Sequence, residues 1–431
     1  MERVRVRPSI YQVFPRNYSK EGTLRKVIDD LPRIAYMGFD YLYLLPIHPI
    51  GKDGRKGSLG CPYSIRDYYA IAEELGTLAD FDELIAKAHE LGLKVMMDIV
   101  LNHSSRDHEW TRSHPEFYIH DGAGNPTSKV PEWSDIADFD YTCPQLADEV
   151  IKMLTYWPTR GVDGYRCDVA SAVPIKIWQR AKEAIAKDYP DFIWLAESTH
   201  AEFIRRMRTH GHYATTDPDI YQAFDIAYNY DIIHFLERAY TEGDILSLTR
   251  VLALREYEYP TYASKLWHLE NHDQPRIASY IKDRQIIKNW LAFSFLMDGA
   301  AFVYNGQEAW AEHMPSLFDK DDIDWRTLDK AYEENIRQLN ALRKKTLPGV
   351  MAVVFPESKE VLSFIEYKGQ DILYGVFDVL NQQSVLPLSL KDGSYHDLLN
   401  DRMVSVDKGQ LASDLCPCLL AAKVNDLTED Y

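Results

Sequence analysis

Apolar runs typical of buried strands alternate with amphipathic helical segments from the beginning of the chain. Residues 9–14, 41–45 and 94–99 are short and strongly apolar, as strands covered on both faces are. Between them, residues 24–37 and 81–91 repeat their apolar positions with helical spacing. This order of strands and helices predicts an α/β fold with a parallel sheet.

Five further runs extend the same pattern. They cover residues 164–168, 192–197, 223–227, 266–270 and 301–304. Several of them are bounded by Gly or Pro, which is typical of short buried strands. Together with the first three runs they complete a set of eight, and we therefore predict a (β/α)8 TIM barrel.

Two connections are longer than a compact barrel needs. Residues 46–80 include a glycine-rich segment before Tyr63, and residues 104–144 are polar but carry Trp110, Trp133 and Phe139. Connections longer than about 12–15 residues are usually functional or disordered. The aromatic side chains favour a function.

The pattern changes at about residue 350. Residues 362–367, 371–379 and 384–390 form alternating runs with short polar turns and no helices between them. We expect an antiparallel, β-sandwich-like C-terminal domain over residues 350–431. The barrel is then assigned to residues 1–103 and 145–349, with a short insertion domain over residues 104–144.

Composition restricts the classes of partner. The chain of 431 residues has 66 acidic and 48 basic side chains, which gives a net charge of −18. No basic patch or stripe is visible in the sequence, so the chain is expected to repel phosphate backbones and anionic lipid surfaces. We expect neither nucleic acid nor a membrane as a partner, whereas neutral substrates are unaffected.

Three features bear on the location of the protein. Residues 1–8 are charged and no apolar stretch follows them, so we expect no secretory signal and predict a cytoplasmic protein. The most apolar run, residues 290–297, is far shorter than the roughly 20 residues that cross a bilayer. The five cysteines have neither CxxC pairs nor zinc-site spacing, and we expect reduced thiols.

Four polar segments each end a predicted strand: residues 98–103, 164–168, 195–197 and 271–273. The candidate functional side chains that they carry are Asp168, Glu197, Asp273, Arg166, His103 and His272. The active sites of (β/α)8 barrels lie at the carboxyl ends of the strands. We therefore expect these side chains to converge at that end of the barrel.

Two of these carboxyl groups suit the cleavage of a glycosidic bond, which needs one carboxylate at the anomeric carbon and one carboxylic acid at the leaving oxygen. Asp168 and Glu197 end neighbouring strands, so their carboxyl groups can face each other. Side chains alternate along a strand, so Arg166 points to the same side as Asp168 and is expected to keep it ionised. Glu197 follows an apolar run, and partial burial beside Asp168 is expected to raise its pKa.

The order of the four segments resembles that of the α-amylase family of glycoside hydrolases (family 13). Residues 60–69, 302–308 and 322–325 extend the resemblance, which covers nearly the whole chain. The resemblance implies a retaining glycosidase that cleaves α-1,4-glucosidic bonds of maltooligosaccharides or soluble starch-type glucans. It also implies that the segment after the third strand forms a small domain over the cleft.

The resemblance further implies a role for each site residue. Asp168 corresponds to the nucleophile, Glu197 to the acid/base and Asp273 to the carboxylate that stabilises the transition state. The substrate-binding side chains that it implies are those of Tyr63, His103, Arg166 and His272. Among them, the Tyr63 ring is expected to form an aromatic platform for the sugar next to the cleaved bond.

One departure from the family concerns the stretch after Asp168. Many members carry a Lys-His pair that holds the sugar beyond the cleavage point and anchors a calcium site, whereas Ser171 and Ala172 stand here. Asn102 and Asp138 offer oxygen ligands of the kind that calcium prefers. Calcium dependence and the metal ligands are thus left open, and no organic cofactor is implied.

Other interpretations apply to the same residues. A carboxylate at a strand end is more often a helix cap or a loop-binding group, and a single histidine more often packs in the core. We take Asp98 as a structural carboxylate at the barrel mouth. The joint occurrence of four segments in this order favours catalysis.

Three functional alternatives stay open at this point. A glycosyl group held by the enzyme can pass to water, to another sugar in a transglycosylase, or back within a disaccharide in an isomerase. A non-catalytic carbohydrate-binding protein on the same barrel is a more distant alternative. The sequence leaves the exact substrate and the oligomeric state open.

Overall fold

The computed structural model describes residues 4–345 and 351–428. Within these ranges, eight parallel strands close into a barrel in the order β1-β10-β9-β8-β7-β6-β3-β2. The barrel strands are β1 (Ser9–Val13), β2 (Tyr41–Leu44), β3 (Lys94–Val100), β6 (Gly164–Asp168), β7 (Ile193–Ala196), β8 (Ile226–Tyr228), β9 (Ser264–Trp267) and β10 (Ala300–Tyr304). The predicted barrel is confirmed.

The predicted boundaries differ most at β8. The apolar residues 223–227 predict a strand, but β8 begins only at Ile226. The preceding α8 (Asp217–Ile220) continues into a turn in which the N–H groups of Ala223 and Phe224 both donate to the Ile220 carbonyl oxygen. Ala223 and Phe224 are therefore buried as part of a turn, which an apolar run cannot distinguish from a strand.

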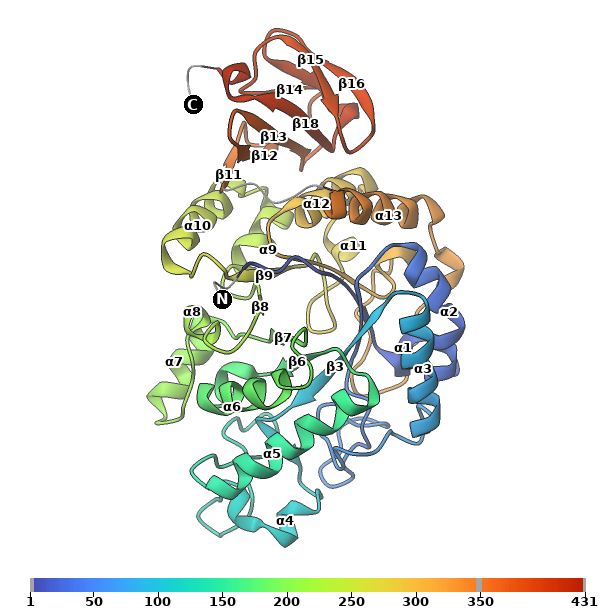
Figure 1. The fold of residues 1–431 in the computed structure, drawn as a ribbon, viewed down its shortest axis with the longest axis vertical. Coiled ribbons are helices and arrows are strands. Elements are labelled where there is room, and N and C mark those ends of the chain that lie inside the picture. The colour runs from blue at the N-terminus through green and yellow to red at the C-terminus, as the bar shows by residue number, and fades with distance from the viewer. Residues whose placement is uncertain (1–3, 346–350, 429–431) are drawn as a thin grey trace.

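Helices surround the barrel (Figure 1). The longer ones are α2 (Leu24–Tyr36), α3 (Leu78–Glu90), α5 (Pro144–Tyr156), α6 (Ile175–Ala186), α7 (Ala201–Thr209), α9 (Ile233–Glu242), α10 (Ile245–Glu258), α12 (Arg284–Leu296) and α13 (Lys330–Lys345). Single turns are α1 (Pro15–Tyr18), α4 (Trp110–Ser113) and α11 (Ile277–Tyr280). Short 3-10 turns lie at Pro115–Phe117, Trp157–Arg160, Ala170–Ala172, Gln307–Ala309, Trp325–Thr327, Ser413–Leu415 and Val424–Asp426. Among the described residues, no helix is both long enough and apolar enough to span a bilayer.

The barrel interior is built by alternate residues of each strand, because strand side chains point to opposite faces with a period of two. Buried apolar side chains fill it, including Leu195, Ile226, Leu266 and Phe302. Towards the carboxyl ends, the same inward positions become polar on β3 and β6, where Asp98 lies beside Arg166 in the strand pairing. The register of the strands therefore places the charged residues at one end of the barrel.

The segment between β3 and α5 contains a small two-stranded sheet. β4 (His103–Ser105) pairs antiparallel with β5 (Ile136–Asp138). The Trp110 ring packs edge-on against Phe117 at 5.6 Å and lies 5.9 Å from the Phe139 ring. This aromatic cluster is continuous with the hydrophobic core of the barrel, and the predicted domain division at residues 104–144 stays a prediction.

The C-terminal part of the chain is an antiparallel β-structure, as predicted. A six-stranded sheet has the order β11-β12-β13-β18-β15-β16, and β14 pairs with β17. The strands are β11 (Met351–Pro356), β12 (Val361–Lys368), β13 (Asp371–Asp378), β14 (Val385–Pro387), β15 (Gly393–Asp397), β16 (Arg402–Val406), β17 (Gln410–Ala412) and β18 (Cys418–Lys423). The predicted domain boundary at residues 349 and 350 falls outside the described residues.

The C-terminal sheet packs on the barrel helices (Figure 1), with β11 against α10 and β13 against α12. The Phe377 ring lies edge-on against Phe293 at 5.5 Å. The Asp378 N–H donates to Asn289 Oδ1 at 2.9 Å. These contacts lie on the outer side of α12 and not at the carboxyl ends of the barrel strands.

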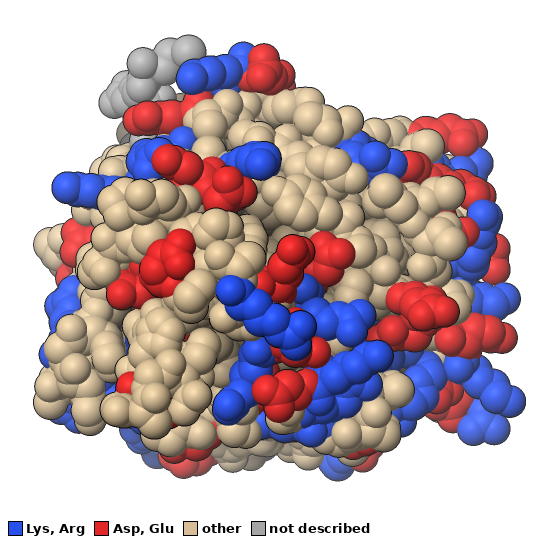
Figure 2. Space-filling view, turned by 90° about the horizontal axis from the view of Figure 1, so that it is seen from below, with Lys and Arg blue, Asp and Glu red and all other residues tan. Residues whose placement is uncertain are grey.

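The surface corrects one expectation from the sequence. We expected no gathering of basic side chains, but Figure 2 shows Lys and Arg gathered in the lower centre of one face, with Asp and Glu among them. The five cysteines are free thiols.

Candidate functional site

Arg166 is the centre of the candidate site. It lies on β6, is fully buried, and its Nη1 is 2.9 Å from Asp98 Oδ1 and 2.9 Å from Asp168 Oδ1. Its Nη2 is 3.1 Å from Glu197 Oε1. Three carboxylates from the ends of β3, β6 and β7 therefore surround one guanidinium, and the predicted convergence of Arg166, Asp168 and Glu197 is observed.

This arrangement keeps the arginine charged. Burial alone would lower the pKa of Arg166, but the Asp98 and Glu197 carboxylates raise that pKa well above its usual value. An arginine at the centre of several carboxylates can also form more than one charge-assisted hydrogen bond, which fixes its orientation. Arg166 is therefore a permanent positive charge at the base of the site.

The pKa values of Asp168 and Glu197 both rise. Burial raises the pKa of Asp168 well above its ordinary value, the Glu197 charge adds to the rise, and Arg166 opposes it. Burial raises the pKa of Glu197 as well, again against the effect of Arg166, and the Asp273 charge adds to the rise. We expected the rise for Glu197. For Asp168, burial outweighs the expected effect of Arg166.

Glu197 is held by the backbone that follows β6. The Val169 N–H donates to Glu197 Oε2 at 2.7 Å. Val169 has a φ of 39°, which is a left-handed conformation that β-branched residues rarely adopt. Such strain persists where the surrounding structure enforces it, and it is often found at functional sites. Here it aims an N–H group at the carboxylate.

Tyr63, His272 and Asp273 form a second group next to Asp98. The Tyr63 hydroxyl donates to Asp98 Oδ2 at 3.0 Å and lies 2.6 Å from His272 Nε2. The two rings stack with centroids 5.6 Å apart. Burial raises the pKa of the Tyr63 phenol well above its usual value, so the hydroxyl keeps its proton as a donor.

The Asp273 carboxylate is the exception among the three candidate catalytic acids, because its pKa is lowered. Burial would raise this pKa, but His272, whose Nε2 is 3.0 Å from Asp273 Oδ2, outweighs that effect. On its other side, His272 Nδ1 lies 3.0 Å from Gln12 Nε2. His272 thus lies between Gln12 and Asp273.

His103 lies beside Tyr63 but outside the carboxylate cluster. Its Nε2 is 3.2 Å from the Tyr63 carbonyl oxygen, and its Nδ1 is 3.2 Å from Asn102 Nδ2. Burial lowers the pKa of His103, which keeps the ring neutral and able to donate from one nitrogen. Its contact with a sugar hydroxyl stays a prediction.

Sequence reasoning missed three residues that support the site. The Tyr43 hydroxyl donates to Asp98 Oδ2 at 2.5 Å, and Gln12 contacts His272. The Arg166 guanidinium carbon lies 5.5 Å from the ring centroids of both Tyr63 and Tyr228. Tyr43, Gln12 and Tyr228 occupy inward positions near the strand ends, so extending the alternation from strand to strand would have found them.

Of the two residues suggested for calcium, Asp138 already has hydrogen-bond partners on both carboxylate oxygens. Asp138 Oδ1 accepts from Asn102 Nδ2 at 2.7 Å, and Asp138 Oδ2 accepts from the Lys129 N–H at 2.6 Å. In the part of the chain that the structure describes, no group of three or more His, Cys, Asp or Glu is placed to hold a metal ion. Asn102 Oδ1, by contrast, is buried and has no hydrogen-bond partner, so calcium binding at Asn102 and Asp138 stays a prediction.

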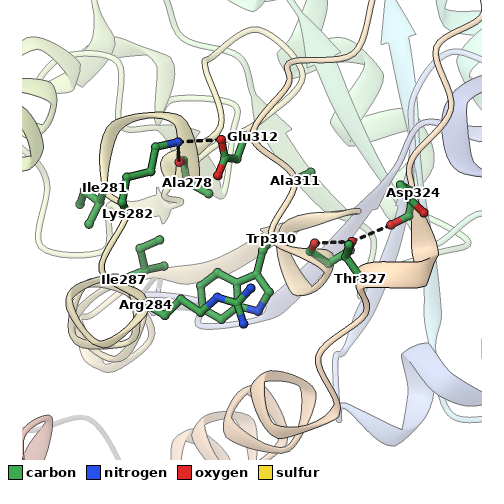
Figure 3. Close-up of a pocket in the computed structure, with 11 residues that line it drawn as sticks. Ala278, Ile281, Lys282, Arg284, Ile287, Trp310, Ala311, Glu312, Asp324 and Thr327 are labelled. Atoms are coloured by element: carbon green, nitrogen blue, oxygen red, sulfur yellow. Dashed lines mark hydrogen bonds and ion pairs between the residues drawn. The ribbon is translucent and has the colours of Figure 1, made fainter.

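A cavity of about 390 Å³ lies in the loops after β9 and β10 (Figure 3). Arg284 lies over the Trp310 ring at 4.5 Å, and the Tyr332 ring packs 4.5 Å from it. Lys282 is paired with Glu312 at 2.7 Å. The Trp310 ring and the charged side chains of Arg284, Lys282 and Glu312 thus already have partners. None of the candidate catalytic residues lines this cavity.

A closed eight-stranded parallel barrel with carboxylates at neighbouring strand ends is the arrangement of a (β/α)8-barrel enzyme. Comparisons with known proteins identify the family. The model of the alpha amylase catalytic domain matches residues 12–133 and 130–347. The model of the bacterial alpha amylase C-terminal domain matches residues 357–420. The chain belongs to the α-amylase family, so the family resemblance of the sequence is confirmed.

Two solved structures resemble the whole chain. An alpha-amylase from Lactobacillus plantarum is 38% identical, with a TM-score of 0.91 over 96% of this chain and 98% of that one. A noncanonic maltogenic alpha-amylase from Thermotoga neapolitana is 32% identical, with a TM-score of 0.83 over 97% and 99% of the two chains. Both similarities include the C-terminal domain, since they extend over nearly the full length.

Curated relatives resemble only part of the chain. An alpha-1,4-glucan:maltose-1-phosphate maltosyltransferase from Streptomyces coelicolor is 38% identical over 212 residues, which are 44% of this chain and 31% of that protein. A maltosyltransferase of the same name from Corynebacterium glutamicum is 35% identical over 231 residues, 47% and 33% of the two chains. The chain therefore matches about a third of the length of these relatives.

Proposed function

We propose that the protein is a retaining glycoside hydrolase that cleaves α-1,4-glucosidic bonds of maltooligosaccharides or soluble α-glucans. The observation that carries the proposal is the position of Asp168 and Glu197 at neighbouring strand ends, both in contact with the buried Arg166. Similarity over the full length to alpha-amylases supports the choice of glucan and of hydrolysis.

In the first step, an Asp168 carboxylate oxygen attacks the anomeric carbon of the sugar. The bond from this carbon to the leaving oxygen breaks, its electron pair stays on the oxygen, and Glu197 donates the proton that neutralises it. The product is a glycosyl ester on Asp168 and a released sugar with a free hydroxyl. Glu197 is left as a carboxylate.

Geometry supports this division of roles. The pKa values of both carboxyl groups are raised, and the Glu197 charge contributes to the rise for Asp168, which favours one shared proton over two ionised groups. Arg166 Nη1 donates a hydrogen bond to Asp168 Oδ1, which opposes the rise of the Asp168 pKa and stabilises the carboxylate that attacks. Arg166 Nη2 approaches Glu197 Oε1 at 3.1 Å without an aligned hydrogen bond, so within this pair only Asp168 receives an aligned hydrogen bond from the guanidinium.

In the second step, the Glu197 carboxylate removes a proton from water, and the water oxygen attacks the anomeric carbon. The ester bond breaks and Asp168 leaves as a carboxylate, while Glu197 is again protonated. Each step inverts the anomeric carbon, so the product has the configuration of the substrate.

The neighbouring residues are proposed to bind and orient the sugar ring. The ionised Asp273 accepts hydrogen bonds from hydroxyls of the distorted ring, whereas His103 and His272 donate to hydroxyls. Tyr63 packs its ring against the apolar face of the sugar. Arg166 stays charged throughout and holds the attacking carboxylate.

Glycosyl transfer is the second candidate, and the partial similarity to maltosyltransferases favours it. The first step is the same, but a sugar hydroxyl replaces water in the second. Product analysis on maltotriose separates the two, because hydrolysis gives only shorter sugars and transfer also gives longer ones. Incubation with sucrose and trehalose tests isomerisation in the same assay.

The experiment that tests the hydrolase is the time course of reducing ends from soluble starch and maltotriose, with proton NMR of the first products. We expect new reducing ends in the α configuration. Longer oligosaccharides without a rise in reducing ends would identify a transferase. Binding of maltooligosaccharide without any new product would identify a carbohydrate-binding protein.

A further inference from the structure

A second cavity, of about 450 Å³, lies outside the catalytic centre. It lies between the loop after β2, the α4 turn and the outer side of α5, and Figure 1 shows α4 and α5 at the end of the molecule opposite the C-terminal sheet. The residues that line it are Tyr69, Trp110, Glu149, Lys152, Thr155, Tyr156 and Thr159. None of them belongs to the proposed catalytic site.

Three aromatic side chains face this cavity, and each is anchored. The Trp110 ring is fixed in the aromatic cluster of the insertion, including an edge-on contact with Phe117 at 5.6 Å. The Tyr69 ring packs edge-on against Tyr156 at 5.2 Å. Tyr69 is nevertheless 38% exposed, whereas Trp110 and Tyr156 are only partly exposed, so the ring of Tyr69 is open to a ligand.

The polar side chains of the cavity are mixed and nearly neutral in sum. Glu149 and Lys152 are paired at 3.7 Å; Lys152 is largely exposed and Glu149 is partly exposed. The Thr155 hydroxyl donates to the Lys152 carbonyl oxygen and the Thr159 hydroxyl donates to the Tyr156 carbonyl oxygen, which leaves their oxygen lone pairs available as acceptors. Donors and acceptors thus surround fixed aromatic rings.

This combination excludes several kinds of ligand. A phosphorylated or strongly charged molecule would find one cation and one anion and no cluster of either sign. A purely apolar molecule would leave the charged groups without partners, which is unfavourable. A neutral molecule with flat apolar faces and many hydroxyls satisfies both the rings and the polar side chains, and a sugar chain has this chemistry.

We propose that this cavity is a second glucan-binding site, in which Tyr69 is the principal stacking surface. The inference rests on the proposed function, because the glucan is taken to be the same polymer that the catalytic site cleaves. A second contact with one polymer chain raises the local concentration of the catalytic site along it. Substrates that are too short to reach both sites gain no such increase from the second site.

The buried residue Tyr68 lies between this cavity and the region of His103. The Trp110 ring lies 6.0 Å from that of Tyr68, which is buried, and the Tyr68 hydroxyl donates to the His103 carbonyl oxygen at 2.8 Å. Trp110 is therefore a poor choice for mutation, since its loss would disturb the insertion and the region of His103. Tyr69 can be replaced with less disturbance because it is partly exposed.

The test is calorimetric titration of the Asp168→Asn variant, in which cleavage is blocked, with maltoheptaose as the probe. We expect two binding sites per chain. Adding Tyr69→Ala should weaken one of them about tenfold, as expected for the loss of a stacked ring, whereas adding Tyr69→Phe should retain both. Adding Tyr257→Ala is the matched control, because Tyr257 is 90% exposed on α10 and far from this cavity in sequence.

Kinetics give a second readout with the active enzyme. Tyr69→Ala should leave kcat/KM for maltotriose unchanged and raise KM for long soluble amylose. A single maltoheptaose site that Tyr63→Ala removes and Tyr69→Ala leaves intact would overturn the second site while supporting the proposed function. Absence of maltoheptaose binding would instead contradict the proposed function, and the second site with it.

Discussion

Arg166 Nη1 and Asp168 Oδ1 are 2.9 Å apart in the interior of the barrel end, where the arginine has no exposure to solvent. The two residues lie on one strand and point to the same side, so their contact is built by the strand itself. The same nitrogen also reaches Asp98 Oδ1. A carboxylate held in this way is already oriented before a substrate binds, which reduces the cost of reaching the transition state.

The first prediction concerns the two proposed catalytic carboxyl groups. Asp168→Asn and Glu197→Gln should each lower turnover of maltotriose by several orders of magnitude, because each removes a step that the other group cannot perform. Circular dichroism and thermal unfolding should show that both variants fold. Turnover near that of the unchanged enzyme in either variant would contradict the assignment.

An activated aryl glycoside should separate the two variants further. Its leaving group needs little protonation, so Glu197→Gln should keep a fast first step and then slow at hydrolysis of the ester. Asp168→Asn should lose the first step. A burst of aryl alcohol is therefore expected from Glu197→Gln and not from Asp168→Asn.

The second prediction concerns pH dependence. The Asp273 charge contributes to the raised pKa of Glu197, so Asp273→Asn should lower that pKa. Because the basic limb of kcat/KM reports loss of the proton from the general acid, this limb should move to lower pH. Asp273→Glu keeps the charge and is the control. A basic limb that stays in place in Asp273→Asn would show that Glu197 is not the acid or that Asp273 does not act on it.

The third prediction separates stacking from hydrogen bonding at Tyr63. Tyr63→Ala should lower kcat/KM for maltotriose by a factor corresponding to about 1–3 kcal/mol, because the ring and both hydroxyl contacts are lost. Tyr63→Phe keeps the ring but leaves Asp98 without one donor. If the ring carries the effect, Tyr63→Phe should retain most of the activity; equal losses in the two variants would assign the effect to the hydroxyl.

The fourth prediction concerns stability in acid. Burial lowers the pKa of His48, His108 and His268 to about 4. In the unfolded chain these histidines have a pKa of about 6.5. The free energy of unfolding is therefore at its full value above that pH. It falls as the pH drops from about 6.5 towards 4, because the unfolded chain binds protons that the folded chain does not. At pH 5 each histidine should lower the free energy of unfolding by about 2 kcal/mol relative to its value above pH 6.5.

Urea unfolding at pH 7 and pH 5, followed by tryptophan fluorescence, measures this loss. His48→Gln removes one titrating group outside the proposed catalytic site, so its free energy of unfolding should fall less between the two pH values than that of the unchanged protein. An identical fall in both proteins would show that His48 is not the source.

Much of the site could be predicted because strand order determines it. The apolar runs before Asp168 and Glu197 are strands, and parallel strands of a barrel bring their carboxyl ends together. The predicted position of Arg166 beside Asp168 needed only the period-two alternation. Asp98 was expected to be structural, and its burial against Arg166 agrees with that interpretation.

Other features depend on contacts between distant segments. The left-handed Val169 follows no turn-forming Gly or Asn, so nothing local in the sequence marks it. The contact of Gln12 with His272 joins the first strand to a loop 260 residues later. The cavity at Tyr69 forms only when the loop after β2 meets α5. Local sequence patterns do not reveal contacts between such distant segments.

The most direct test of the central claim is to identify the residue that becomes glycosylated. Glu197→Gln is incubated with an activated aryl α-maltoside, stopped in acid, digested and analysed by peptide mass spectrometry. We predict a peptide heavier by one maltosyl group, with the group on Asp168. A maltosyl group on another residue, or no adduct despite a burst of aryl alcohol, would contradict the assignment of Asp168 as the nucleophile.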